Sequence, residues 1–193
     1  MKDLLHYSYL KIKYFFRIRK SRGFGIHSPF VFRLVTQVIK DDHPFYVFDL
    51  LDKKLEKYAY RDVKYAKMVY RIINELRIKN IYCNSSAFEC SKLICENADS
   101  QHKFLKSMHE NVEGYKLVYA GDDDLDSLLE KETINSLKGT KTIVILSEMY
   151  KCDATLDAYK TLKSEAQVSL DLFYRALLFF DPKLQKGSYS IKV

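Results

Sequence analysis

The stretch Lys79–Leu93, KNIYCNSSAFECSKL, constrains the fold more than any other part of this sequence. A short apolar run ends at Cys83, small residues follow over Ser85–Ala87, and apolar residues then recur at helical spacing. A strand that feeds a helix through a small-residue turn is a typical unit of doubly wound α/β folds. Such a turn brings backbone N–H groups and a helix N-terminus to one point, where these folds bind nucleotide-like cofactors.

The turn departs from the pattern that cofactor binding requires. It contains no glycine, although a backbone that approaches a ligand closely needs the freedom of glycine. Ser85, Ser86 and Ala87 are small enough to turn, but Glu89 places a carboxylate where the ligand would lie. The residues alone therefore predict an α/β domain without an intact cofactor site.

Strands and helices alternate along most of the chain. Strands are predicted at Asn80–Cys83, Lys103–Leu105, Lys116–Ala120, Thr142–Leu146, Val168–Phe173, Ala176–Phe180 and Tyr189–Val193. Because strands follow one another directly at the C-terminal end, we expect a three-layer α/β sandwich with a mostly parallel sheet and an antiparallel C-terminal edge. A basic helical arm and cap is predicted over residues 1–45, and the α/β domain over residues 46–193.

Polar residues mark where several helices begin. Ser28 is a predicted N-cap, with Pro29 at the first position of a helix that extends to Ile39. The run Asp122–Asp124 lacks the spacing of a calcium loop, so we interpret it as a solvated turn that caps a helix over Leu125–Leu137. Further helices are predicted over Leu50–Tyr60, over Val63–Leu76, from Cys90 to Ala98, and over Ala154–Leu162 with Asp153 as its cap.

The basic charge of the protein is concentrated in the arm. The whole chain carries a net charge of +7, whereas residues 1–40 hold nine basic side chains and one acidic side chain. Residues Leu4–Lys20 have the pattern of an amphipathic helix. Its apolar face contains Leu5, Tyr9, Ile12 and Phe16, and its flank carries Lys13, Arg17 and Lys20. The apolar face can pack on its own domain or on a second subunit, which we favour because core burial explains most amphipathic helices; alternatively, the helix lies on an anionic membrane or follows phosphates.

The cysteines and the hydropathy pattern limit the class of protein. Cys83, Cys90, Cys95 and Cys152 show no C-x-x-C pair or matching histidine spacing, so we predict buried thiols rather than a disulfide framework or a metal site. The N-terminus lacks the apolar core and cleavage site of a signal peptide, and no segment is apolar enough to span a bilayer. We therefore expect a cytoplasmic protein.

Several segments, in order, resemble a group of class I S-adenosylmethionine-dependent methyltransferases known chiefly from Bacteroidetes. GFGIHSPFVFRLVTQVI resembles the opening signature of that group, G-H-G-x-H-S-P-F-V, with Phe24 in place of the first histidine. KYAKMVYRIINELRIKNIY is similar to its helix leading into the first strand. SLDLFYRALLFF is similar to its closing I-D-L-F-x-x-G-L-V-F-F, with Ala176 replacing the glycine. The resemblance implies a Rossmann-like fold of methyltransferase type.

The resemblance also implies where the methyl donor would bind. The motif E-L-G-T-S-x-G of the group aligns with residues 83–89, which places Ser85, Ser86, Ala87 and Glu89 at the cofactor loop and removes its carboxylate and both glycines. The motif F-D-D-I-H-W aligns with residues 146–151, which leaves Glu148 and Tyr150 as candidates for acid/base catalysis.

The altered loop predicts a methyltransferase-like protein with a degenerate S-adenosylmethionine site and a binding role without catalysis. Two alternatives stay open. One is an active methyltransferase whose donor is held by main-chain groups of Ser85–Ala87. The other is a nucleic-acid or membrane-surface module in which Lys13, Arg17 and Lys20 contact an anionic partner. A homo-oligomer is compatible with each of these functions.

Overall fold

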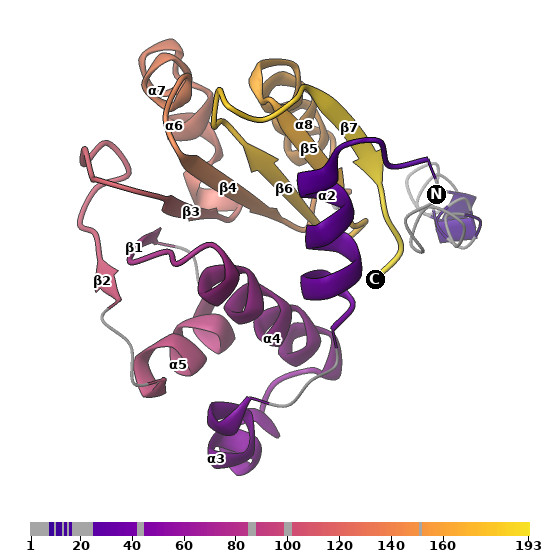
Figure 1. Cartoon of the computed structure of the whole chain (residues 1–193), viewed down its shortest axis with the longest axis vertical. Helices are drawn as coiled ribbons and strands as arrows, with labels where there is room; N and C mark the ends of the chain where they lie inside the picture. The colour runs from indigo at the N-terminus through magenta and orange to yellow at the C-terminus, as the bar shows by residue number, and fades with distance from the viewer. Residues whose placement is uncertain are drawn as a thin grey trace.

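The computed structural model describes residues 8, 9, 11, 12, 14, 16, 25–41, 45–84, 88–98, 102–150 and 152–193. These residues include a seven-stranded sheet in the order β2-β1-β3-β4-β6-β5-β7 (Figure 1). The strands are β1 (Asn80–Cys83), β2 (Lys103–Phe104), β3 (Lys116–Ala120), β4 (Thr142–Ser147), β5 (Val168–Asp171), β6 (Arg175–Phe179) and β7 (Gly187–Ser190).

Most strand pairs in the sheet are parallel. β1, β2, β3 and β4 pair in parallel, and β5 pairs in parallel with β7. β6 is antiparallel to both of its neighbours, β4 and β5. The predicted mostly parallel sheet is therefore confirmed, and antiparallel pairing occurs near the C-terminal edge, although it was predicted at the edge itself. The antiparallel strand is inserted inside the sheet, however, and β7 forms the outer edge on that side.

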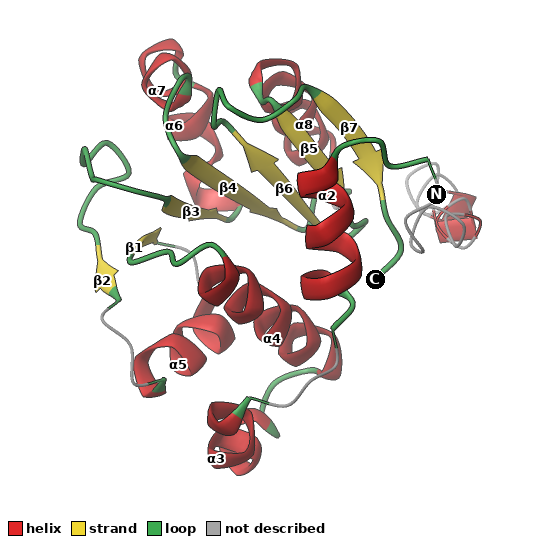
Figure 2. Cartoon of the chain, viewed as in Figure 1, coloured by secondary structure: helices red, strands yellow, loops and turns green. Residues whose placement is uncertain are grey.

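Helices precede and follow the strands. They are α2 (Pro29–Arg33), the π-helix η3 (Leu34–Ile39), α3 (Tyr46–Leu55), α4 (Tyr60–Glu75), α5 (Glu89–Asn97), the 3₁₀-helix η5 (Asp122–Asp124), α6 (Leu125–Leu129), α7 (Lys131–Leu137) and α8 (Asp153–Glu165). Figure 2 shows helices on both sides of the sheet.

Alternate residues of the central strands face two different hydrophobic cores. In β3, Leu117 and Tyr119 join one core, whereas Val118 and Ala120 join the other. The first core includes buried side chains from α2, η3, α3, α4 and α5, and the second includes side chains from α6, α7 and α8. The described chain is thus a three-layer α/β arrangement.

The pairing of the strongest predicted strands is confirmed. Residues 80–83 and 142–146 lie in one sheet, in parallel, with β3 between them. Ile81, Ile143 and Ile145 are fully buried, as expected where helices cover both faces of a parallel sheet.

Several helix ends differ from the prediction. Ser28 caps α2 as expected, because its Oγ accepts a hydrogen bond from the Val31 N–H at 3.4 Å. The segment predicted as one helix over 125–137 is broken at Glu130, whose ψ of 135° is extended. α8 is capped by Cys152 rather than Asp153, because the backbone N–H of Cys152 donates to Thr155 Oγ1 at 3.3 Å. α3 begins at Tyr46, earlier than the predicted Leu50.

Among the described residues, no helix is long and apolar enough to cross a membrane.

Candidate functional site

After β1, the chain first adds β2 on one side of it and then crosses over to add β3 on the other side, so the strand order reverses at β1. In open α/β sheets, ligands bind in the crevice outside the carboxyl ends of the strands at such a switch point. β1 ends at Cys83 and β3 ends at Ala120, so the segments that follow these two residues form the switch point of this fold.

The predicted cofactor loop is only partly within the described residues. Ser85, Ser86 and Ala87 lie outside them. Glu89 is the first residue of α5, and its side chain is exposed. The preceding Phe88 is fully buried, with its ring centroid 4.6 Å from that of Tyr119 in β3. An aromatic pair therefore joins the start of α5 to the strand across the switch point.

A polar contact also spans the switch point. The backbone N–H of Gly121 donates to Asp124 Oδ2 at 3.1 Å, and the side chain of Asn84, directly after β1, also hydrogen bonds to Asp124. Asp124 is 3% exposed, and burial raises the pKa of its carboxyl group. The prediction that all of residues 122–124 form a solvated turn is therefore wrong for Asp124. Its side chain turns inward because Gly121 and Asn84 supply hydrogen-bond donors there.

Glu148 belongs to an ion-pair network at the carboxyl end of β4. Its Oε1 lies 3.1 Å from Arg61 Nη2 and 3.4 Å from Arg175 Nη1. Arg175 is 3% exposed, and its Nη2 lies 3.5 Å from Asp62 Oδ1. The side chain of Arg175 also hydrogen bonds to Tyr119. Two guanidinium groups thus hold the Glu148 carboxylate, so it is engaged as an ion-pair acceptor rather than poised as a base.

Tyr150 has a different set of partners. Its hydroxyl donates to Asp171 Oδ2 at 2.8 Å, and its ring centroid lies 5.2 Å from that of Phe173. Asp171 Oδ1 accepts the backbone N–H of Phe173 at 2.8 Å. The structure therefore places Glu148 with Arg61 and Arg175, and Tyr150 with the turn between β5 and β6.

Two residues near this network have unusual backbones. Glu148 and Phe173 adopt positive φ angles of 51° and 75°, which residues with side chains rarely do. The backbone N–H of Glu148 donates to the carbonyl of Tyr174 at 2.8 Å, which ties the two strained segments together. Such strain persists where surrounding contacts over-determine it.

Sequence reasoning missed the centre of the network. Arg175 begins β6, and Arg61 and Asp62 lie in the first turn of α4, far from Glu148 in sequence. The available signal was a basic residue at the start of the apolar run RALLFF, since a charge in a buried strand needs partners. The sequence does not say which acids those partners are.

The arm is described at six positions between residues 8 and 16. Lys13, Arg17 and Lys20 lie outside the described residues. The apolar face predicted to pack inward is exposed at the positions described, with Tyr9 58%, Ile12 59% and Phe16 82% accessible. Tyr14 is buried instead, with its ring centroid 4.9 Å from that of Phe173 and its hydroxyl bonded to the backbone of Val193. The described part of the arm thus contacts the domain through Tyr14.

Among the described residues, no group of three or more His, Cys, Asp or Glu side chains could hold a metal ion. Comparison of the chain with protein-family models, with curated proteins and with solved structures gave no match in any of the three.

Proposed function

We propose that this chain is a methyltransferase-like protein with a degenerate S-adenosylmethionine site, and that it acts by binding rather than by methyl transfer. The proposal combines the sequence resemblance with one observation, which is that side chains of the protein bridge the switch point. Asn84 and Asp124 meet there through a hydrogen bond, and Phe88 is buried against Tyr119.

These contacts oppose donor binding because they use the space and the polar groups that a ligand needs. A cofactor at a switch point requires backbone that it can approach closely and an open crevice between the two strands. Asp124 already accepts hydrogen bonds from Gly121 and Asn84, so its carboxylate is engaged. Cys83 offers no carboxylate for the ammonium group of the donor, and Glu89 adds negative charge near the carboxylate of the donor.

Because Cys83, Ser85 and Glu89 replace the carboxylate and both glycines of the group's motif, contacts to the donor are missing and donor binding should be substantially weaker. One charge-assisted hydrogen bond contributes about 1.5–3 kcal/mol, so two or three losses weaken a micromolar site by roughly several hundredfold or more. Because a methyltransferase works mainly by orienting the donor against its acceptor, loss of donor binding also removes activity.

Titration calorimetry with S-adenosylmethionine and its demethylated product tests the proposal. We expect no saturable heat with either compound at micromolar concentrations. Glu89→Gly alone should not restore binding, because Cys83 and Ser85 remain. A triple variant, Cys83→Glu with Ser85→Gly and Glu89→Gly, restores the carboxylate and both glycines of the group's motif and should gain affinity. A dissociation constant in the low micromolar range for the unmodified protein would contradict the proposal and favour the alternative, an active methyltransferase.

A second candidate function is binding to an anionic surface through the arm. The exposure of Tyr9, Ile12 and Phe16 favours it, because these three side chains lie on one predicted helix face and do not enter the core. Apolar side chains beside basic ones are typical of helices that lie in a membrane interface.

A further inference from the structure

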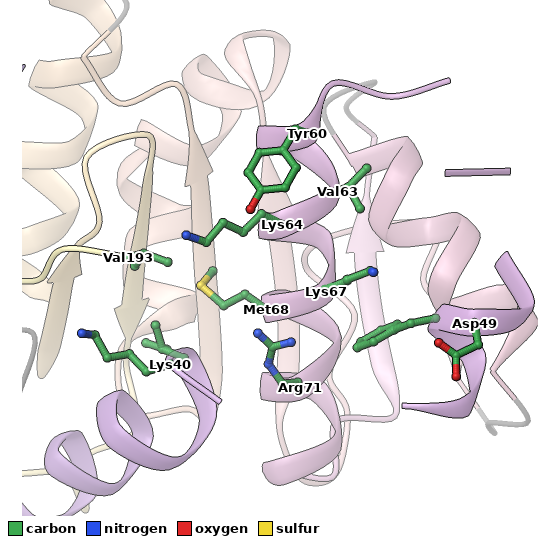
Figure 3. Close-up of a pocket in the computed structure, with 11 residues that line it drawn as sticks. Lys40, Asp49, Tyr60, Val63, Lys64, Lys67, Met68, Arg71 and Val193 are labelled. Atoms are coloured by element: carbon green, nitrogen blue, oxygen red, sulfur yellow. The ribbon is translucent and has the colours of Figure 1, made fainter. Parts of the chain in front are cut away.

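A groove of about 560 Å³ runs along the outer face of α4 (Figure 3). Its floor is a stripe of α4 side chains at helical spacing, namely Tyr60, Val63, Lys64, Lys67, Met68 and Arg71. Ile39, Lys40 and Val193 form one wall, and Phe48 and Asp49 form the other. None of these residues makes the contacts that bridge the switch point, so the groove is a separate site.

The groove is strongly cationic. Among the described residues that line it, Lys40, Lys64, Lys67 and Arg71 carry basic side chains and Asp49 carries an acidic one. Lys64, Lys67 and Arg71 follow one another three and four residues apart on the helix, and like charges at this spacing repel. A bound anion would relieve this repulsion.

Two of the three cations at the floor, Lys64 and Lys67, have no carboxylate partner within the described part of the chain. Within the described part of the chain, Lys64 has no ion pair or hydrogen bond. The ammonium of Lys67 lies 5.2 Å from the ring centroid of Phe48, which orients it without cancelling its charge. By comparison, the exposed Lys138 and Lys160 have carboxylate partners at 2.7 Å and 2.8 Å.

Arg71 is a fixed element of the floor. It is 8% exposed, and its Nε donates to the carbonyl of Val38 at 3.2 Å, which holds the guanidinium plane. Figure 3 shows this guanidinium pointing toward the groove, on the same side of α4 as Lys64 and Met68. The carbonyl comes from the π-helix η3, an irregular turn of the kind that often occurs at functional sites. A rigid guanidinium is well suited to bind phosphate oxygens in pairs.

The apolar lining and the size of the groove restrict the ligand further. Met68 is 1% exposed at the floor, and Tyr60 is 82% exposed at one end. A volume of this size fits a small organic molecule, and the buried depth of Met68 and Arg71 excludes a nucleic-acid duplex from the floor. We propose that the groove binds a phosphorylated small molecule of nucleotide size, with its phosphates on Lys64, Lys67 and Arg71 and its ring against Tyr60.

Calorimetric titration of the full chain with ATP, without divalent metal, tests this site. We expect saturable binding that weakens with salt. Lys64→Gln with Lys67→Gln should raise the dissociation constant about tenfold or more, because two charge-assisted contacts are lost. Lys131→Gln, which removes one positive charge from an exposed helical position outside the groove, should leave the dissociation constant within about twofold.

Further titrations make the test decisive. Tyr60→Ala should weaken ATP binding but leave binding of inorganic triphosphate unchanged, because only ATP carries a ring. Absence of saturable ATP binding at millimolar concentration would overturn the proposal, as would equal affinity in the double lysine variant. Binding of a short RNA or of anionic vesicles that is lost in that variant, with no ATP binding, would assign the groove to a macromolecule instead. S-adenosylmethionine titrated in parallel reports on the switch point independently, because its site shares no residue with the groove.

Discussion

Burial separates the four cysteines into two pairs with different chemistry. Cys90 and Cys95 are 5% and 1% exposed, and burial raises the pKa of Cys90 to about 11 and that of Cys95 to about 12. Because the thiolate is the reactive form, these two thiols should be nearly inert at pH 8. Cys152 is exposed and Cys83 is partly exposed.

We expect a disulfide reagent such as DTNB to modify Cys152 first and Cys83 more slowly in the folded protein. All four cysteines should react at similar rates in guanidinium chloride. Cys152→Ser should remove the fast phase, which peptide mass spectrometry can assign. Rapid modification of Cys95 in the native protein would contradict the buried position of α5.

The role of a single residue could be predicted from the sequence where its interaction partners lie close to it in the chain. Ser28 caps α2 because its partner, Val31, is three residues away. Asp124 could not be placed in the same way, because one of its partners is Asn84, forty residues earlier in the chain. The same limit applies to Glu148, whose place in a network depends on Arg61 and Arg175.

The ion-pair network joins three elements, α4, β4 and β6. Arg175 at the start of β6 connects Asp62 of α4 with Glu148 at the end of β4. Removing one partner of a buried ion pair typically costs about 3–5 kcal/mol. Since the two acids are partly exposed, we expect Arg175→Ala to lower the free energy of unfolding by about 3 kcal/mol, near the lower end of that range.

Urea unfolding monitored by circular dichroism measures this loss. Arg33→Ala is the matched control, because Arg33 forms an exposed ion pair with Glu75 and should cost less than about 1 kcal/mol. If the two alanine variants lose the same stability, Arg175 does not act as a buried structural cation.

At the level of helices and strands, the apolar pattern predicted the type and order of the elements better than the residues at which they begin and end. β1 and β3 match their predicted ranges because both are short apolar runs bounded by polar or small residues. The pattern could not show that α6 and α7 are separate helices, since their apolar spacing continues through Glu130. Nor could it give the place of β6, because strand order depends on pairing between distant segments.

For the whole molecule, the arm offers a test of surface binding. Tyr9, Ile12 and Phe16 in the arm are exposed, and basic residues dominate its sequence. We expect the protein to sediment with vesicles containing phosphatidylserine at low salt, and to be released as salt shortens the screening length. Deletion of residues 1–22 should abolish this binding, and Ile12→Ser with Phe16→Ser should weaken it.

Tyr14→Phe serves as the control for the arm, because it changes the inward contact with Val193 and leaves the exposed side chains in place. Vesicle binding that survives the deletion would show that the arm is not the binding surface. A deletion variant that is unfolded would show that the arm serves the stability of the domain instead.

The position of β6 affects how the chain can be synthesised. β4 is buried along its whole length, and on one side its neighbour is β6, which the ribosome makes only after α8 and β5. A nascent chain that ends between residues 148 and 174 therefore presents TIVILS as an open apolar edge, the kind of segment that pairs with other chains. A premature stop codon in this interval should therefore yield an insoluble fragment, whereas a chain that extends through β6 covers this edge of β4.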